Sequence, residues 1–209
     1  MQLYHSTPNK KDIIKGKKIC INKKFNYNKY LEYILTNSHN MKTPEQLPGN
    51  YTKFGGSAPF MGHGIYCFDN EEDANVYQAN CEVLEIHYED ECSKFDLDDE
   101  VVLLTVSDYL DELESKFSED DTKLEKFSGW LNLIALLKLC LYDDFKTSEP
   151  AVGLILFILY YHKKIKRSDL LIRSFYVKID VVGELEKKQK YFLISNKSKI
   201  EKMCWNMFT

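Results

Sequence analysis

Three residues of the stretch GHGIYCFDNEEDANVY (62–77) have the types and the spacing to hold a flat ligand. Gly64 and Tyr66 fall on one face of a predicted strand over 64–68, because successive strand side chains alternate between faces. Tyr77 lies two turns into the helix predicted next, and it returns near Tyr66 where that helix packs back on its strand. Two rings facing across a gap can sandwich a heterocycle, and a glycine lets a ligand approach the backbone. From the residues alone, simple core packing of both tyrosines is the favoured alternative.

Other reactive side chains show weaker patterns. The histidines and cysteines, including His63 and Cys67, have neither metal-ligand spacing nor a CxxC pair, so no metal site is predicted. No local sequence marks a cysteine activated by a neighbouring base. The glycines of GHG lack the Gly-Lys-Ser/Thr of a P-loop. The basic stretch HKKIKRSDLLIR (162–173) is interpreted as the solvated end of a helix, because no aromatic residues are interleaved with its cations.

Composition limits the class of protein. The chain has 209 residues, a formal net charge of −4, 44% hydrophobic and 29% charged residues, which indicates a globular domain. The acidic balance disfavours a general nucleic-acid binder. Six scattered cysteines and an N-terminus without an apolar signal region predict reduced thiols and a cytoplasmic location. The longest apolar run, AVGLILFILYY (151–161), is too short to span a bilayer, so no membrane partner is predicted.

The elements that must position these residues follow an α+β pattern. Strands are predicted over 2–6, 64–68, 81–88, 174–183 and 191–195. Helices are predicted from Thr7-Pro8 to Gly16, over 28–38, from Asp69 or Asn70, over 107–117 with a serine cap at 107, twice within 127–163, and from Asn196. Residues 38–62, rich in proline and glycine, are predicted to be a long loop of the kind that forms lids or binding loops. The order indicates a single domain over 1–209 with a helical insertion at about 107–165.

Two motifs in this order carry a resemblance. LYHST (3–7), followed by GHGIYCFDNEEDANVY, resembles the ADP-ribosyltransferase superfamily in its diphtheria-toxin and poly(ADP-ribose)-polymerase-like branch. That branch ends its first strand with a histidine and carries G-x-G-I-Y-F on a later strand. Its polymerases have a second tyrosine at the spacing that separates Tyr66 from Tyr77 here. The resemblance covers about the first ninety residues. It implies split antiparallel sheets with a helical insertion, and NAD as substrate with no metal.

The resemblance also implies roles for residues in the two motifs. His5 would hydrogen-bond the adenosine ribose of NAD. Ser6, which replaces the usual glycine, would hold the nicotinamide carboxamide through its backbone, with Thr7 beside it. Tyr66 and Tyr77 would stack around the nicotinamide ring, with Gly64 in the same motif. Nicotinamide is a flat cationic leaving group, and aromatic faces suit such a group.

The family's third element is a glutamate, or sometimes another residue, that opens a late strand. The matching stretch here is QKYFLIS (189–195), which puts Gln189 or Lys190 at that position. Neither is a carboxylate, and Gln189 is the candidate. Glu184 and Glu186 lie just before it in a charged turn whose ordinary role is solubility.

The function implied is mono-ADP-ribosyl transfer from NAD to a macromolecular acceptor, a protein rather than a nucleic acid, with His5, Tyr66 and Gln189 as catalytic residues. Polymers are not expected, because the glutamate is missing. A catalytically inactive NAD-binding or protein-interaction module of the same fold is the alternative. An RNA 2′-phosphotransferase of this fold relies on arginines, and the chain has two, Arg167 and Arg173.

Overall fold

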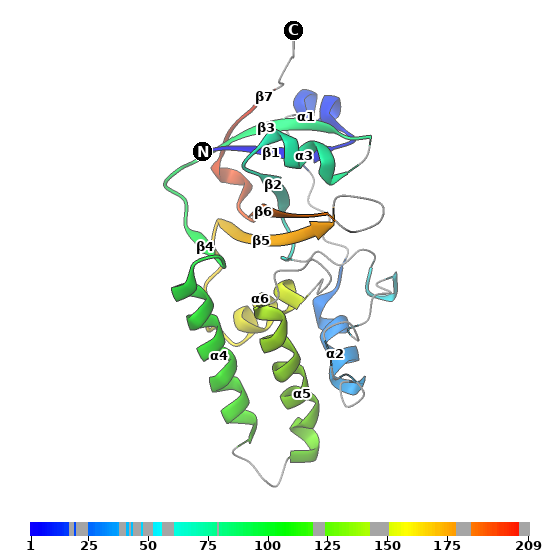
Figure 1. Cartoon of the computed structure of the whole chain (residues 1–209), viewed down its shortest axis with the longest axis vertical. Helices are drawn as coiled ribbons and strands as arrows, with labels where there is room; N and C mark the ends of the chain where they lie inside the picture. Colours follow the sequence, from blue (N-terminus) through cyan, green and yellow to red (C-terminus); the bar gives the residue numbers. More distant parts are fainter. Residues whose placement is uncertain are drawn as a thin grey trace. The chain divides into compact units, whose positions relative to one another are not determined.

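The computed structural model of the chain divides into two compact units (Figure 1). The sheet unit comprises Met1–Asn22, His63–Asp98 and Ser168–Thr209, and the helical unit comprises Lys23–Gly62 and Asp99–Arg167. The structure describes residues 1–16, 19, 25–37, 41, 43, 47, 52–55, 61–78, 80–118, 124–142, 151–178 and 185–204, and only the backbone of residues 52, 124–127 and 178. The helical segment after the first strands thus runs over 99–167, where an insertion at about 107–165 was predicted, and it shares its unit with residues 23–62.

Seven strands of the sheet unit form one mixed sheet in the order β4-β5-β6-β2-β1-β3-β7. They are β1 (Gln2–Thr7), β2 (Ile65–Phe68), β3 (Glu82–Tyr88), β4 (Lys94–Asp96), β5 (Leu170–Lys178), β6 (Glu186–Ile194) and β7 (Ile200–Cys204). The β4–β5 pair is parallel and the other five neighbouring pairs are antiparallel. The α+β class is confirmed. The short strand β4 was not predicted, because three residues give too little alternation to recognise.

The strands are joined in one hydrogen-bonded order where split sheets were expected. The join in the middle is narrow: β5 and β6 share nine register pairs, whereas β1 and β2 share the single pair Tyr4↔Phe68. Beyond that pair, β1 continues its pairing with β3 through Thr7↔Glu82, and β2 continues with β6 through Ile65↔Ile194. The sheet is therefore continuous, and its two halves separate beyond one point of contact.

Two helices cover opposite faces of this sheet (Figure 1). Ile13 of α1 (Lys10–Gly16) belongs to the buried core on the face of Leu3 and Cys67. Tyr77 of α3 (Glu71–Tyr77) packs on Phe68, with ring centroids 5.1 Å apart. Because Phe68 follows Cys67 in a strand, its side chain points to the other face.

The predicted cap of α3 at Asn70 is confirmed, whereas the predicted start of the first helix at Thr7-Pro8 is wrong, because α1 begins at Lys10. The Oγ1 atom of Thr7 accepts a hydrogen bond from the N–H of Asn9 at 3.2 Å, just before α1. The Oδ1 atom of Asn70 accepts one from the N–H of Asp73 at 2.8 Å, which makes Asn70 the cap of α3. The Asn70 side chain satisfies a backbone donor that the first turn of α3 leaves unpaired, and the Thr7 side chain holds the turn that leads into α1.

The predicted C-terminal helix is wrong. Asn196 caps only the single 3₁₀ turn η6 (Lys197–Lys199), by accepting from the N–H of Ser198 at 3.1 Å. The chain then forms β7, which pairs with β3 at the edge of the sheet. Ile200 and Met203 pack against the core from this strand. Their apolar contacts with the sheet stabilise an extended segment, whereas a helix over these residues would not pair with β3.

The described helices of the helical unit are α2 (Tyr27–Asn37), η3 (Thr52–Phe54), α4 (Glu100–Ser118), α5 (Leu124–Leu141) and α6 (Ala151–Tyr161). The predicted start of α4 at Ser107 is wrong, because Asp99 accepts the N–H of Val101 at 2.8 Å and begins the helix earlier. Its predicted apolar positions Leu110, Leu113 and Phe117 are buried. Most of the predicted 38–62 loop, Pro150 and residues 179–183 of the predicted last long strand lie outside the described residues.

Aromatic and apolar packing stabilises the helical unit. Tyr27 of α2 stacks on Phe157 of α6 with centroids 5.4 Å apart, and Phe117 of α4 stacks on Trp130 of α5 at 5.1 Å. Eight of the eleven residues of α6 are buried, as its uniformly apolar sequence predicts. Among the described residues, no helix has the length and apolarity needed to cross a membrane.

Candidate functional site

The β1–β2 junction, defined here by His5, Ser6 and Thr7 of β1 with Ile65 and Tyr66 of β2, is the place where the strand ladder opens. Only Tyr4↔Phe68 pairs the two strands, although both continue as strands on either side of the opening. Backbone groups in the middle of a sheet normally pair with the next strand. At this junction, a side chain supplies one of the missing partners.

That side chain is His5. Its Nδ1 atom lies 2.8 Å from the backbone carbonyl oxygen of Tyr66. A carbonyl only accepts, so Nδ1 carries the proton and Nε2 of the neutral ring is left as an acceptor. Burial lowers the pKa of His5 below its usual range, and the bond to Tyr66 opposes that shift. The neutral ring with an accepting Nε2 is therefore the form present near pH 7.

Ser6 and Thr7 differ in how their hydroxyls are used. Both residues are buried, with 6% and 4% of their surface exposed. The Thr7 hydroxyl accepts from the N–H of Asn9, so the turn before α1 occupies it. Within the described part of the chain, the Ser6 Oγ atom is buried without a hydrogen-bond partner. Such a group costs about 1–3 kcal/mol, which a ligand that supplies a partner would recover.

The two tyrosines are brought to one face of the sheet. Tyr66 and Phe68 are two apart on β2, and their partners on β6 are Leu193 and Tyr191. The Tyr77 ring lies over Phe68 and contacts Tyr191 with centroids 5.9 Å apart. Tyr77 therefore sits one strand position along from Tyr66, on the same face. The helix tyrosine packs back on strand β2, where its described ring contacts are with Phe68 and Tyr191, and its predicted place beside Tyr66 stays a prediction.

Strand alternation puts the His5 side chain on the other face from Ser6 and Tyr66. The Tyr4↔Phe68 pair sets this relation, because Tyr4 and Ser6 share a face while His5 points oppositely. His5 reaches Tyr66 through the carbonyl at the strand edge. A ligand in the opening would thus meet the His5 ring from one face and the Ser6 hydroxyl from the other.

Position 64, next to the junction, must be a glycine, because strand β6 leaves no room for a side chain there. A Cβ atom at this position would lie 2.5 Å from Leu193 Cδ1 and 2.7 Å from the carbonyl oxygen of Ile194. Any larger residue would push β6 away from β2. The close approach of the two strands accounts for this glycine. The space beside its Cα is filled by atoms of β6.

Gln189 lies on the tyrosine face but is enclosed. Its side chain is buried, and its Oε1 atom accepts from the Tyr191 hydroxyl at 3.0 Å. Its Nε2 atom donates to Asp73 of α3 at 3.3 Å. Asp73 also pairs with Lys187 at 2.6 Å and accepts from Asn70 at 2.9 Å. This network connects β6 to α3, and through Tyr191 it connects Gln189 to Tyr77.

Lys190 alternates to the opposite face, where its Nζ atom lies 3.8 Å from Asp96 and 3.9 Å from Asp98. Glu186 begins β6 and is exposed, and Glu184 lies outside the described residues. Arg173 is buried and donates from Nη1 to the carbonyl of Leu97 at 2.8 Å, a structural role. Lys190 and Glu186 therefore point away from the tyrosine face, whereas Arg173, the register partner of Tyr191, lies on that face with its guanidinium bonded to the Leu97 carbonyl.

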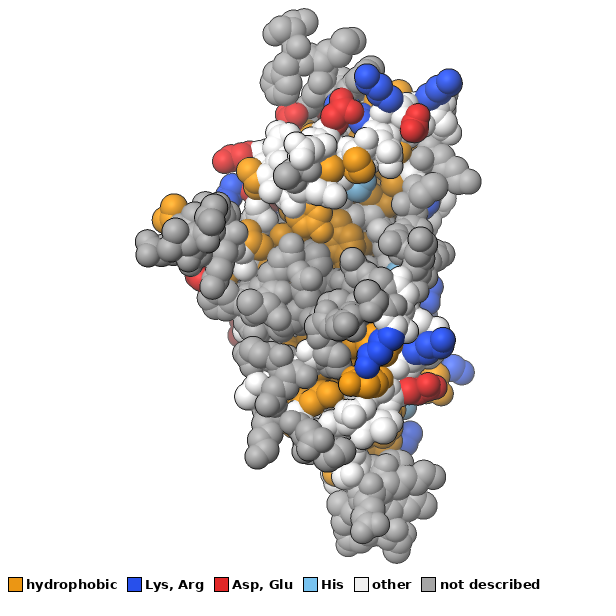
Figure 2. Space-filling model, turned by 90° about the vertical axis from the view of Figure 1, so that its right-hand side faces the viewer, with side chains coloured by type: hydrophobic (Ala, Val, Ile, Leu, Met, Phe, Trp, Pro, Cys, Tyr) orange, Lys and Arg blue, Asp and Glu red, His pale blue; other side chains and the backbone are white. Residues whose placement is uncertain are grey.

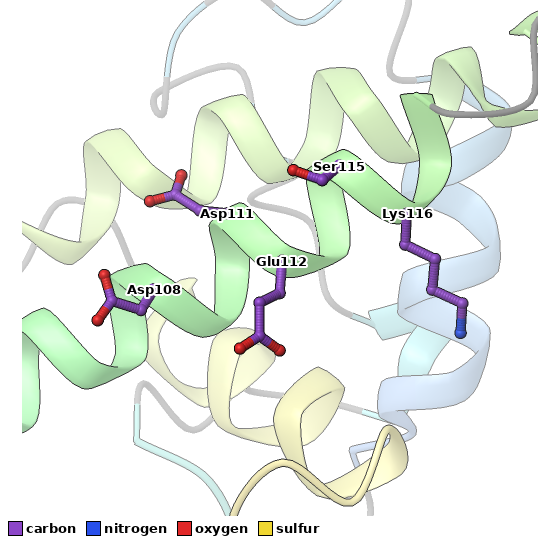
Figure 3. A pocket seen from close by; sticks show the side chains of 5 residues that line it. All are labelled: Asp108, Asp111, Glu112, Ser115 and Lys116. Carbon is purple, nitrogen blue, oxygen red and sulfur yellow. The ribbon is translucent and has the colours of Figure 1, made fainter.

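A second polar region is a shallow hollow on α4. Its lining side chains, shown in Figure 3, are Asp108, Asp111, Glu112, Ser115 and Lys116. All of them belong to one helix, and two of the three carboxylates have ion-pair partners. Asp111 pairs with Lys138, and Glu112 pairs with Lys164. This acidic surface tethers neighbouring segments of the helical unit and has no buried group directed at a ligand.

Sequence reasoning missed two arrangements in the sheet unit. Asp73 was expected only to suit the helix dipole, yet it is buried and organises the network under Tyr77. Glu85 and His87 were not paired, although residues two apart on a strand share a face. Their side chains are 2.6 Å apart, and Cys204 lies beside them. The alternation of side chains along β3 could have revealed the pair Glu85 and His87. Their contact with Cys204 could not be predicted, because strand β7 was not predicted.

Comparison with protein-family models, curated proteins and solved structures found no match to this chain. The function is therefore argued from the residues and the geometry of the β1–β2 junction.

Proposed function

We propose that the protein binds NAD at the β1–β2 junction and transfers one ADP-ribose to a protein acceptor. The observation that carries the proposal is the bond from His5 Nδ1 to the Tyr66 carbonyl at 2.8 Å, made where the ladder opens. The Ser6 hydroxyl beside it is buried and has no partner among the described residues. His5 and Tyr66 belong to the two motifs that resemble ADP-ribosyltransferases, and their bond brings these motifs together in space.

His5 has the hydrogen-bonding state that the proposed role needs. The Tyr66 carbonyl fixes the proton on Nδ1, so Nε2 can accept from a ribose hydroxyl. The lowered pKa keeps the ring neutral near pH 7. A protonated ring would donate from both nitrogens and lose this acceptor. The geometry therefore supports ribose recognition by a neutral histidine.

The tyrosine face suits the nicotinamide ring. Tyr66 would supply one aromatic face, and Tyr77, fixed by Phe68 and Tyr191, would supply the other. In the reaction the bond between C1′ of the ribose and N1 of nicotinamide breaks, and nicotinamide leaves with the bonding electrons. The acceptor nucleophile forms the new bond to C1′ and gives up its proton to solvent. Stacking favours the cationic ring before departure.

Gln189 is assigned a positioning role. Its two amide ends are bonded to Tyr191 and Asp73, which hold the ring of Tyr77 and helix α3. Because position 189 itself carries an amide, it would stabilise the oxocarbenium-like state less than a glutamate at that position. This observation favours a second candidate function, an NAD-binding or protein-interaction module of the same fold without turnover.

A protein acceptor fits the charge distribution better than a nucleic acid. The chain has a net charge of −4. Figure 2 shows that, on the face in view, Lys and Arg side chains of the described residues are interspersed with Asp and Glu. Nucleic-acid binding draws its affinity from a continuous basic surface, which this face does not present in its described part.

The test is NAD consumption in the presence of a cell extract. Nicotinamide release is measured by chromatography, and ADP-ribose on acceptor proteins is measured by mass spectrometry. The His5→Ala and Tyr66→Ala variants should lose both signals while retaining the wild-type circular dichroism spectrum. Tyr176→Ala, a half-exposed tyrosine on β5, is the matched control and should retain both.

Binding of NAD to the wild type, followed by calorimetry, separates the two candidates. Binding without nicotinamide release supports the non-catalytic module. Absence of both binding and release rejects the assignment of NAD to this junction.

A further inference from the structure

We propose that Glu85, His87 and Cys204 form a transition-metal site at the β3–β7 edge of the sheet, which binds Zn²⁺ with one open position. The three side chains each offer one ligand atom, and these atoms lie within 4.8 Å of one another. The proposal is independent of the function proposed for the β1–β2 junction.

The register of two strands fixes this cluster. Glu85 and His87 are two apart on β3, so they share a face, and Cys204 on β7 is the direct partner of Glu85. Because the positions are set by backbone pairing, the three donors converge without help from a flexible loop. Cys204 is far in sequence from Glu85 and His87, so the three residues do not show the spacing of a local metal motif.

The distances need only a small change to accept an ion. A tetrahedral zinc ion with its usual bond lengths places neighbouring ligand atoms about 3.3–3.6 Å apart. His87 Nε2 and Glu85 Oε1 are now in hydrogen-bond contact at 2.6 Å. Binding would replace that hydrogen bond by two metal bonds and widen the contact.

Glu85 is the group with most to gain. Its side chain is 11% exposed, and within the described residues its hydrogen-bond and ion-pair partner is the half-buried His87. A carboxylate held away from water is costly unless a positive charge compensates it. A divalent ion with one carboxylate and one thiolate is electrically neutral, which suits this position.

The donor types select the metal. A thiolate and an imidazole favour Zn²⁺, Co²⁺ or Cu over Mg²⁺ and Ca²⁺, which prefer oxygen ligands. On binding, Cys204 loses its thiol proton to solvent, and the proton that His87 Nε2 now donates to Glu85 leaves Nε2, so that Nε2 coordinates the ion and the neutral ring carries its proton on Nδ1. With three protein ligands, water fills the fourth position, as in zinc sites that are not closed.

The experiment titrates the metal-free full chain with Co²⁺ and then displaces it with Zn²⁺. The wild type should bind one ion, with a near-ultraviolet thiolate-to-cobalt band and the visible bands of a tetrahedral site. Cys204→Ser should abolish the charge-transfer band, and His87→Asn and Glu85→Gln should weaken binding at least tenfold. Cys92→Ser and Glu82→Gln, which change a second half-buried cysteine and an exposed acid of the same strand, are the matched controls and should bind as the wild type does.

Alkylation gives a readout that does not depend on variants folding. Zn²⁺ should protect Cys204 of the wild type from iodoacetamide, while the labelling of Cys81 and Cys92 stays unchanged, as read by peptide mass spectrometry. A charge-transfer band that persists in Cys204→Ser, or equal labelling of Cys204 with and without Zn²⁺, would overturn the proposal.

Discussion

Polar side chains gather both at the β1–β2 junction and on the acidic surface of α4, yet the two regions use them oppositely. At the junction, Ser6 is buried and, among the described residues, its hydroxyl has no partner. On α4, Asp111 and Glu112 are exposed and pair with Lys138 of α5 and with Lys164. The number of polar groups is therefore a poor guide to a binding site. Burial without satisfaction is the better guide, because such groups have free energy to gain from a ligand.

The largest expected effect is a loss of stability on filling the close contact between β2 and β6 beside the junction. Gly64→Ala places a methyl group against the Leu193 side chain and the Ile194 carbonyl of β6. We expect it to lower the free energy of unfolding by about 3 kcal/mol, since overpacking of this kind forces backbone movement. Urea denaturation followed by circular dichroism measures the change.

Gly16→Ala is the matched control, because among the described residues no atom from outside its own helical turn lies within 4 Å of a Cβ at Gly16. That variant should be neutral or slightly more stable. Equal destabilisation of the two glycine variants would contradict the assigned packing.

The next prediction tests the comparison directly with two serines that are each 6% exposed. Ser6→Ala removes a buried hydroxyl without a described partner, so the ligand-free protein should be unchanged or more stable by up to about 1 kcal/mol. Ser174→Ala removes a hydroxyl that donates to Asp98 at 2.7 Å, so stability should fall by about 1–2 kcal/mol. Chemical denaturation decides the signs.

In the presence of NAD the ranking of the two serine variants should change. The stabilisation by NAD should shrink in Ser6→Ala and stay at the wild-type value in Ser174→Ala. A loss of stability in ligand-free Ser6→Ala would show that its hydroxyl already has a partner.

A smaller effect follows from pH. Burial lowers the pKa of His5 in the folded protein, so its neutral form is favoured by folding. The stability it contributes is complete above the unfolded pKa of about 6.5 and is lost as pH falls through that value towards the folded pKa. The slope is at most about 1.4 kcal/mol per pH unit. Unfolding measured from pH 7.5 to 5.5 should show a smaller decline in His5→Gln than in the wild type.

NAD affinity should stay constant from pH 7.5 to 6.5 and should decline only as pH falls through the lowered pKa of folded His5, because protonation then removes the Nε2 acceptor. An affinity that already falls between pH 7.5 and 6.5 would argue against a neutral His5 with a lowered pKa as the ribose acceptor.

The smallest effect belongs to α4. Lys138→Met breaks the pairs with Asp111 and Glu114, and stability should fall by no more than about 1 kcal/mol, less at high salt. NAD binding should not change. A change in NAD affinity in this variant would mean that the acidic surface takes part in binding, and the contrast between the two regions would fail.

The sequence was informative where one pattern determined one element. Strand alternation around Tyr66, the Asn70 cap and the apolar faces of α4 and α6 were readable, because each depends on neighbours in the chain. The pairing of β7 with β3, the parallel β4 and the position of Gln189 under α3 depend on residues more than a hundred positions apart or on contacts with no local signature. The motifs of β1 and β2 predicted that these two strands would lie close together. That they share only the register pair Tyr4↔Phe68 could be learned only from the structure.

The parallel pairing of β4 with β5 has a consequence for how this chain can change in length. A parallel pair needs a crossover of only about a dozen residues, and here Asp99–Arg167 makes that connection. Asp98 and Asp169 hold the two ends of the crossover through Ser174 and Ser93. The sheet therefore constrains where this segment leaves and returns, while its length and sequence are left to the packing of the helical unit. Insertions and deletions accumulated over evolution should concentrate between these two anchored ends.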